Sequence, residues 1–140
     1  MDVKLAVLAE YASVSTDGKL NLLGIFNQIS SDKMPAGVPI IYIAVSFEAG
    51  PAEFGSTKRI ETFLHDEDNA QLLHAEQTAT VPRADRAGVR ATLNVVSAVA
   101  GLGFAKAGTY QFAILVDGRT ETTIPLHVVQ LEGGANAAGN

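Results

Sequence analysis

The segment from Gly108 to Val129 constrains the fold more than any other part of the chain, because its pattern defines two strands and the turn between them. In its first half, apolar side chains alternate with polar or small ones, which is typical of a strand buried on one face. The second half repeats this alternation after an Asp-Gly turn signal. The apolar positions are Tyr110, Phe112, Ile114 and Val116, then Ile124, Leu126 and Val128. The segment therefore predicts a β-hairpin with one face in a hydrophobic core.

The turn of this hairpin decides which residues lie opposite one another. Asp117 and Gly118 usually indicate a two-residue loop, but a regular hairpin with that loop would place the two apolar sets on opposite faces. A three-residue loop ending at a left-handed Gly118 restores the common face and pairs Tyr110 with Ile124, so we predict that loop. Pro125 has no N–H to donate, so we expect either that its N–H side faces outward or that the return strand lies at a sheet edge there.

The rest of the chain contains shorter segments of the same kind, separated by turn signals. Strands are expected over Val3–Tyr11, Leu20–Ile29, Val38–Phe47, Thr57–Leu64, Leu72–Val81 and Val89–Val96. Connections are expected at Ser15–Gly18, Ser30–Gly37, Asp66–Asn69 and Pro82–Gly88. Gly24 indicates a bulge within its strand. The small apolar segment Ala98–Phe104 is expected to cross between sheets before the final hairpin.

About eight short strands at this spacing, without a segment that predicts a long helix, are typical of a two-sheet antiparallel β-sandwich. Its topology is immunoglobulin-like or jelly-roll-like, and the strand count does not choose between the two. Residues 1–130 are expected to form a single domain, since a chain of 140 residues is long enough for one hydrophobic core. Residues 131–140 have little apolar surface to bury and are expected to form a flexible C-terminal tail.

Composition and charge exclude several classes of function. The net charge of −5 and the pI near 5.0 argue against a nucleic-acid partner. No apolar run approaches the roughly 20 residues of a membrane span, and the acidic Asp2 is unlike the start of a secretory signal. Cysteine is absent, which excludes disulfides and thiol chemistry. We therefore expect a cytoplasmic protein with no membrane or nucleic-acid partner.

The turn after the fourth expected strand resembles a calcium loop in its spacing of oxygen ligands. Asp66, Asp68 and Asn69 are closely spaced, as the ligands of hard cations are. A calcium loop that begins at Asp66 would need glycine at Gln71 and glutamate at Gln77, and neither is present. The pattern favours a solvated turn.

Histidines near this turn suggest a second kind of metal chemistry. His65 and His74 flank the turn and could share a zinc ion with Asp66 or Glu76 in one strand register, while His127 lies far along the chain. Two imidazoles do not by themselves make a site. We predict no metal and no cofactor, and leave open whether His65, His74, Asp66 or Asp68 ever bind one.

Signals for catalysis are weak, and one basic segment suggests an anion or a partner. There is no cysteine and no Gly-x-Ser-x-Gly segment for a nucleophile, so we expect a protein that is not an enzyme.

The cations of the basic segment are Arg83, Arg86 and Arg90, with Lys58 and Arg59 as further candidates. They could form a patch that contacts an anionic ligand or partner, or they could belong to a solvated loop.

Several segments resemble a family of small uncharacterised bacterial proteins. The segments that carry this resemblance are Ala9–Val14, Asp17–Phe26, Phe47, Pro51–Gly55 and Gly108–Val129. The match extends over about residues 1 to 129, and where the family tends to have glycine after Asp68 this chain has Asn69. The resemblance implies an immunoglobulin-like sandwich and supplies no activity, ligand or catalytic residue.

These observations predict a non-catalytic β-sandwich that acts through protein contacts, as a homo-oligomer or an accessory subunit. Exposed strand edges are the natural contact surfaces of such a fold, and the first and last strands are the candidates for them. The alternative is a small-ligand or carbohydrate binder that uses loops at one end, such as Ser30–Pro39 and Arg83–Arg90.

Overall fold

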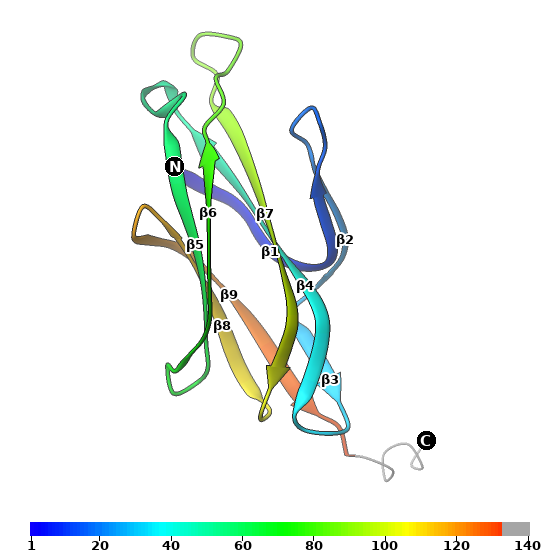
Figure 1. Ribbon diagram of the computed structural model, residues 1–140. Helices are drawn as coiled ribbons and strands as arrows, with labels where there is room; N and C mark the ends of the chain where they lie inside the picture. The colour runs from blue at the N-terminus through cyan, green and yellow to red at the C-terminus, as the bar shows by residue number, and fades with distance from the viewer. Residues whose placement is uncertain (133–140) are drawn as a thin grey trace.

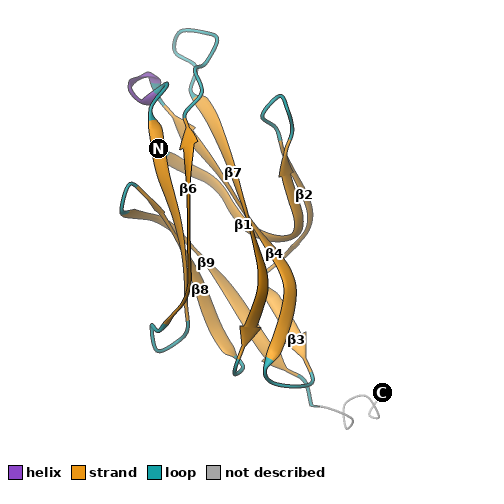
Figure 2. Cartoon of the chain, viewed as in Figure 1, coloured by secondary structure: helices purple, strands orange, loops and turns teal. Residues whose placement is uncertain are grey.

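The computed structural model describes residues 1–132, in which the chain forms nine strands and one short 3-10 turn (Figures 1 and 2). The first strands are β1 (Asp2–Val14), β2 (Leu20–Phe26), β3 (Gln28–Ser31) and β4 (Ala36–Ala49), followed by the 3-10 turn η1 (Pro51–Glu53). The others are β5 (Thr57–His65), β6 (Gln71–Thr80), β7 (Ala91–Phe104), β8 (Gly108–Val116) and β9 (Arg119–Gln130). The predicted all-β class is confirmed, with nine strands in place of about eight. The predicted tail lies outside the described residues from residue 133 onward.

The strands form two sheets that share one core. Sheet A has the order β2-β1-β4-β7, and sheet B has the order β3-β9-β8-β5-β6. Sheet B is mixed, because β3 pairs with β9 in parallel, so the prediction of purely antiparallel sheets is wrong for this pair. The buried side chains that fill the space between the sheets include Leu8, Ile41, Ile43 and Phe47 from sheet A and Leu64, Phe112, Ile114 and Leu126 from sheet B.

The β8–β9 hairpin keeps its apolar residues on one face, but by a different device from the one predicted. Its loop has two residues, Asp117 and Gly118, with φ values of 48° and 85°, as a type I′ turn requires. Further from the turn, even-numbered residues of β8 pair with even-numbered residues of β9. The register shifts by one residue there because Glu121 is the extra residue of a β-bulge. Tyr110 consequently pairs with Leu126 and not with Ile124. The prediction of a left-handed Gly118 is confirmed, and that of a three-residue loop is wrong.

Strand β3 was not distinguished from β2 in the sequence, which predicted one strand as far as Ile29 and a connection over Ser30–Gly37. The segment Gln28–Ser31 pairs with His127–Gln130 and is too short to show its own periodicity. This pairing begins just after Pro125, so within residues 1–132 β9 has a partner only on its β8 side at the proline. The expected sheet edge at Pro125 is therefore confirmed.

Strand β7 does not cross between the sheets, as Ala98–Phe104 was expected to do. It pairs with β4 along its whole length, from Ala91 opposite Ala49 to Phe104 opposite Ala36. Gly101 within this segment has φ 71° and, by the register of its neighbours, lies opposite Pro39. The buried side chains change from odd positions such as Val99 to the even position Phe104 across this glycine.

The first hairpin leaves the sheet and folds over it. Strand β1 pairs with β4 only as far as Ala9, while its pairing with β2 continues to Val14. We call this projecting hairpin, residues Glu10–Ile25, the arm (Figure 1). Gly18 at its tip contacts Asn94 on the side of β7 that faces away from the core. The arm therefore lies across the outer face of sheet A. Gly24 within it has φ 69°, but the β1–β2 register does not shift there.

Candidate functional sites

An exposed group of large apolar side chains lies where the arm leaves sheet A. Tyr11 pairs with Leu23 across the arm and contacts the ring of Tyr42 on β4, with ring centroids 5.2 Å apart. Leu23 and Ile25 are 67% and 58% exposed, and Ile40 is 37% exposed. We call these five residues the apolar patch. Exposed apolar side chains that lie next to one another in this way are candidates for a contact surface.

The strand at the border of this patch is an unprotected sheet edge. β2 pairs with β1 on one side, and no other strand within residues 1–132 pairs with its second side. Its sequence, Leu20–Phe26, contains neither a charged residue nor a proline, which are the devices that usually prevent edge-to-edge association. The first and last strands were predicted to be the edges. This is wrong for β1, which lies between β2 and β4, and for the end of β9, where β3 pairs with His127–Gln130.

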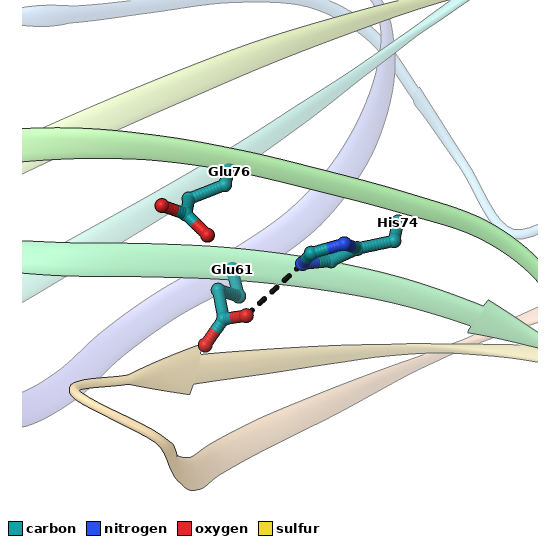
Figure 3. Close-up of side chains that lie close together, drawn as sticks. All are labelled: Glu61, His74 and Glu76. Atoms are coloured by element: carbon teal, nitrogen blue, oxygen red, sulfur yellow. Dashed lines mark hydrogen bonds and ion pairs between the residues drawn. The ribbon is translucent and has the colours of Figure 1, made fainter.

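The outer face of sheet B is polar and contains a cluster of three metal-ligand residues. Glu61 on β5 lies directly opposite Glu76 on β6, and His74 is two residues before Glu76 on the same face. Figure 3 shows the three side chains together on one side of the two strands. The His74 Nε2 atom lies 3.0 Å from Glu61 Oε2, and the ligand atoms of all three residues lie within 4.8 Å of one another.

Aromatic stacking orients the histidine of this cluster. Phe63 pairs with His74 across β5 and β6, and the two rings are stacked with centroids 4.4 Å apart and planes 10° from parallel. The His65 ring stacks more loosely on Phe63, with ring centroids 6.1 Å apart. Both histidine rings therefore lie against Phe63, and His74 is the nearer of the two. Of the residues considered from sequence, His74 and Glu76 come together, whereas His65 and Asp66 do not join them. Glu61 was missed, since a cross-strand partner requires the register.

The suspected calcium turn uses its oxygens for its own backbone. The Asp66 carboxylate accepts hydrogen bonds from the backbone N–H groups of Asp68 and Ala70, both at 2.9 Å. Asn69 takes a left-handed conformation with φ 64°. This is the hydrogen-bonding pattern of an aspartate-stabilised turn.

The three arginines considered as an anion or partner contact line one open hollow of about 460 Å³ beside the β6–β7 loop. Arg90 is already paired, because its guanidinium lies 2.8 Å from Asp2 and 3.5 Å from Glu48. Arg83 lies beside Gly55, and Arg86 is on the loop itself. The structure thus brings the three together, and acidic neighbours neutralise one of them.

The other cations of the suggested patch lie on β5 in pairs of their own. Lys58 lies 3.0 Å from Glu53, and Arg59 lies 3.4 Å from Glu61. The hydrogen bond from Lys58 lowers the pKa of Glu53 below the ordinary value of a glutamate.

The two loops suggested for ligand binding lie at opposite ends of the sandwich. The connection before β4 is at the Phe104 end of β7, whereas the loop over residues 82–90 precedes Ala91 at its other end (Figure 1). A hollow of about 490 Å³ lies at the first end, lined by Glu10, Phe26, Gln28, Ile29, Gly37, Val38, Pro39 and Ile40. The two loops therefore cannot line a common site.

The fold and these surfaces define a two-sheet, sandwich-like β-domain with an apolar patch on one outer face and a polar cluster on the other. The chain belongs to DUF6941, a family of unknown function, whose model matches residues 4–129. A search of curated proteins found no match. No helix within residues 1–132 has the length and hydropathy needed to cross a membrane.

Proposed function

We propose that this protein is a non-catalytic cytoplasmic interaction module that associates with a second copy of itself through β2 and the apolar patch. The observation that supports this most directly is the uncharged edge of β2 next to the exposed side chains of Leu23 and Ile25. A free strand edge offers backbone donors and acceptors to another strand, and apolar side chains beside it add buried area.

A second copy is the occupant that the charges favour. The chain has a net charge of −5, so two copies repel one another over most of their surface. The residues of the apolar patch and of β2 are themselves uncharged, and the Glu10 carboxylate beside Gly24 is a charge that pairing would bring to this edge. Antiparallel pairing of β2 with the same strand of a second copy is self-complementary, as a two-fold interface requires.

Size measurement in solution tests this proposal. Sedimentation velocity should show concentration-dependent association of the full chain. Leu23→Lys and Ile25→Lys should each give a monomer, because they place a charge at the interface. The matched control is Leu72→Lys, since Leu72 is an exposed leucine (45%) on the edge strand of the other sheet. Substitutions at exposed positions typically change stability by less than about 0.5 kcal/mol, so all three variants should fold.

Two outcomes would contradict self-association through this surface. One is a wild-type chain that stays monomeric at about 100 μM, where a complex with a Kd of about 10 μM would be well populated. The other is association that survives both lysine substitutions.

A second candidate function is the binding of a small apolar ligand in the hollow beside β3. Its volume of about 490 Å³ falls in the range of ligand sites, and Phe26, Ile29 and Val38 provide an apolar lining. Saturable fluorescence enhancement of the apolar dye ANS should be seen with the folded chain and should be lost in Val38→Asp. Enhancement that is unchanged in this variant would place the dye elsewhere and remove the support for this candidate.

A further inference from the structure

We propose that Glu61, His74 and Glu76 form a binding site for a divalent first-row transition metal of the zinc type, on the outer face of sheet B. The proposal is independent of the self-association through sheet A. It rests on three ligand residues that two paired strands hold on one face, with their ligand atoms within 4.8 Å of one another (Figure 3).

The strand register holds the three ligands without any loop. His74 and Glu76 are two residues apart on β6 and share a face, and Glu61 lies opposite Glu76 on β5. Zinc bonds to nitrogen and oxygen are about 2.0–2.2 Å, so neighbouring ligand atoms around a tetrahedral ion are about 3.4 Å apart. The 3.0 Å separation of His74 Nε2 from Glu61 Oε2 is already close to this value. Side-chain rotations alone can therefore close the site.

The charges of the cluster favour a cation between the two carboxylates. Like charges that face one another across two strands are destabilising, and Glu61 and Glu76 are such a pair. The Glu61 side chain is only 12% exposed, so solvent does little to screen its charge. Arg59 lies 3.4 Å from Oε1 of Glu61, which leaves Oε2 directed toward His74. A divalent ion there would offset the charge of Glu76 and the part of the Glu61 charge that Arg59 leaves.

Phe63 acts as a positioning residue for the histidine ligand. Its ring lies against the His74 ring at 4.4 Å and nearly parallel, which limits rotation of the imidazole. A ligand held in place before binding loses less conformational entropy when the metal arrives. The chemistry of the set selects the class of metal, because imidazole with carboxylates suits zinc and its neighbours, whereas calcium and magnesium prefer oxygen ligands alone. Three protein ligands leave a position for water.

Zinc titration of the full chain by isothermal calorimetry tests the site, with zinc ion alone as the probe. One zinc should bind per chain. His74→Ala should abolish saturable binding, and Glu61→Gln and Glu76→Gln should each weaken it at least about 10-fold, which is the lower range for disturbing even an outer-shell partner of a metal site. The matched control is His65→Ala, which removes a histidine that also stacks on Phe63 but lies outside the cluster. It should bind zinc like the wild type.

Two further measurements separate metal binding from a purely structural role of the cluster. Far-UV circular dichroism should show that the His74→Ala chain is folded. Zinc should shift the imidazole NMR signals of His74 more than those of His65 and His127, and Phe63→Leu should weaken binding about 10-fold while all three ligands remain. The proposal is overturned if zinc does not bind saturably to the wild type, or if His74→Ala binds it as tightly as His65→Ala does.

Discussion

The backbone carbonyl of Gly18 accepts a hydrogen bond from Asn94 Nδ2 at 2.8 Å. Gly18 lies between β1 and β2, whereas Asn94 lies on β7, at the other edge of sheet A. This contact fastens the tip of the arm over β4. It also accounts for the burial of Ala9 and Ala44, since both are outward-facing positions that are fully covered. The arm thus holds Tyr11, Leu23 and Ile25 in the orientation that forms the apolar patch.

Asn94→Ala should release the arm without unfolding the domain. The free energy of unfolding should fall by less than about 1 kcal/mol, because the variant loses one hydrogen bond and also removes a buried Oδ1 atom that has no partner within residues 1–132. Amide hydrogen exchange over residues 15–25 should become faster, as expected when a segment opens locally. The control is Asn21→Ala, because the Asn21 side chain donates its hydrogen bond to Ser13 within the arm, at 3.5 Å. Equal exchange in both variants would show that the tip contact does not hold the arm.

Much of the strand content could be predicted from the sequence, and most of the pairing details could not. Alternation over Tyr110–Val116 reports which face is buried, and it identified this strand correctly. The alternation does not show where the pairing of β8 with β9 shifts by one residue. A bulge at Glu121 and a longer loop both leave the same alternating pattern in the sequence. Strand β3 is defined by its partner β9, and four residues carry no periodicity of their own.

The candidate site was predictable only in part for a similar physical reason. His74 and Glu76 belong to one strand, so their common face follows from spacing alone. The contribution of Glu61 depends on the β5–β6 register, which one residue of slip would reverse. The apolar patch was not predicted, because the side chains of Tyr11 and Leu23 look like core positions until the arm is seen to leave the sheet.

Gly118→Ala should destabilise the β8–β9 turn through its backbone alone. Gly118 has φ 85°, and a β-carbon there would meet Arg59 Nη2 only at 3.7 Å, which is an ordinary contact. The left-handed conformation costs a residue with a side chain about 1–2 kcal/mol, so urea denaturation should show a loss of that size. Gly37→Ala is the control, since a β-carbon at Gly37 meets no atom of residues 1–132 within 4 Å and its φ is not left-handed. A similar loss in both variants would show that backbone strain is not the cause.

Gln77→Leu should loosen the contact between the two sheets at their β6 and β7 edges. The Gln77 amide donates hydrogen bonds to Ser97 Oγ at 2.7 Å and to the Val96 carbonyl at 3.3 Å, which joins sheet B to sheet A. Each of the two bonds contributes about 0.5–1.5 kcal/mol, so the free energy of unfolding should fall by about 1–3 kcal/mol. Gln71→Leu, at an exposed position of the same strand, should have little effect in the same denaturation experiment.

Lys58→Met should reduce stability at neutral pH and have little effect in acid. The Lys58 ammonium lies 3.0 Å from Glu53 and lowers its pKa below that of an ordinary glutamate. A lowered folded-state pKa contributes stability that is complete above the unfolded-state value and is lost as the pH falls through the folded-state value. Because both side chains are partly exposed, at 17% and 29%, the difference from wild type at neutral pH should be no more than about 1 kcal/mol.

Urea denaturation at several pH values measures this difference. Lys106→Met is the control, because Lys106 and Asp68 are 62% and 78% exposed and an ion pair between such side chains contributes almost nothing. The gap between wild type and Lys58→Met should close as the pH falls into the acidic range, since protonated Glu53 has no charge for Lys58 to stabilise. If the stability difference between wild type and Lys58→Met stayed constant with pH, the loss would instead come from the packing of the apolar stem of Lys58, which methionine keeps only in part.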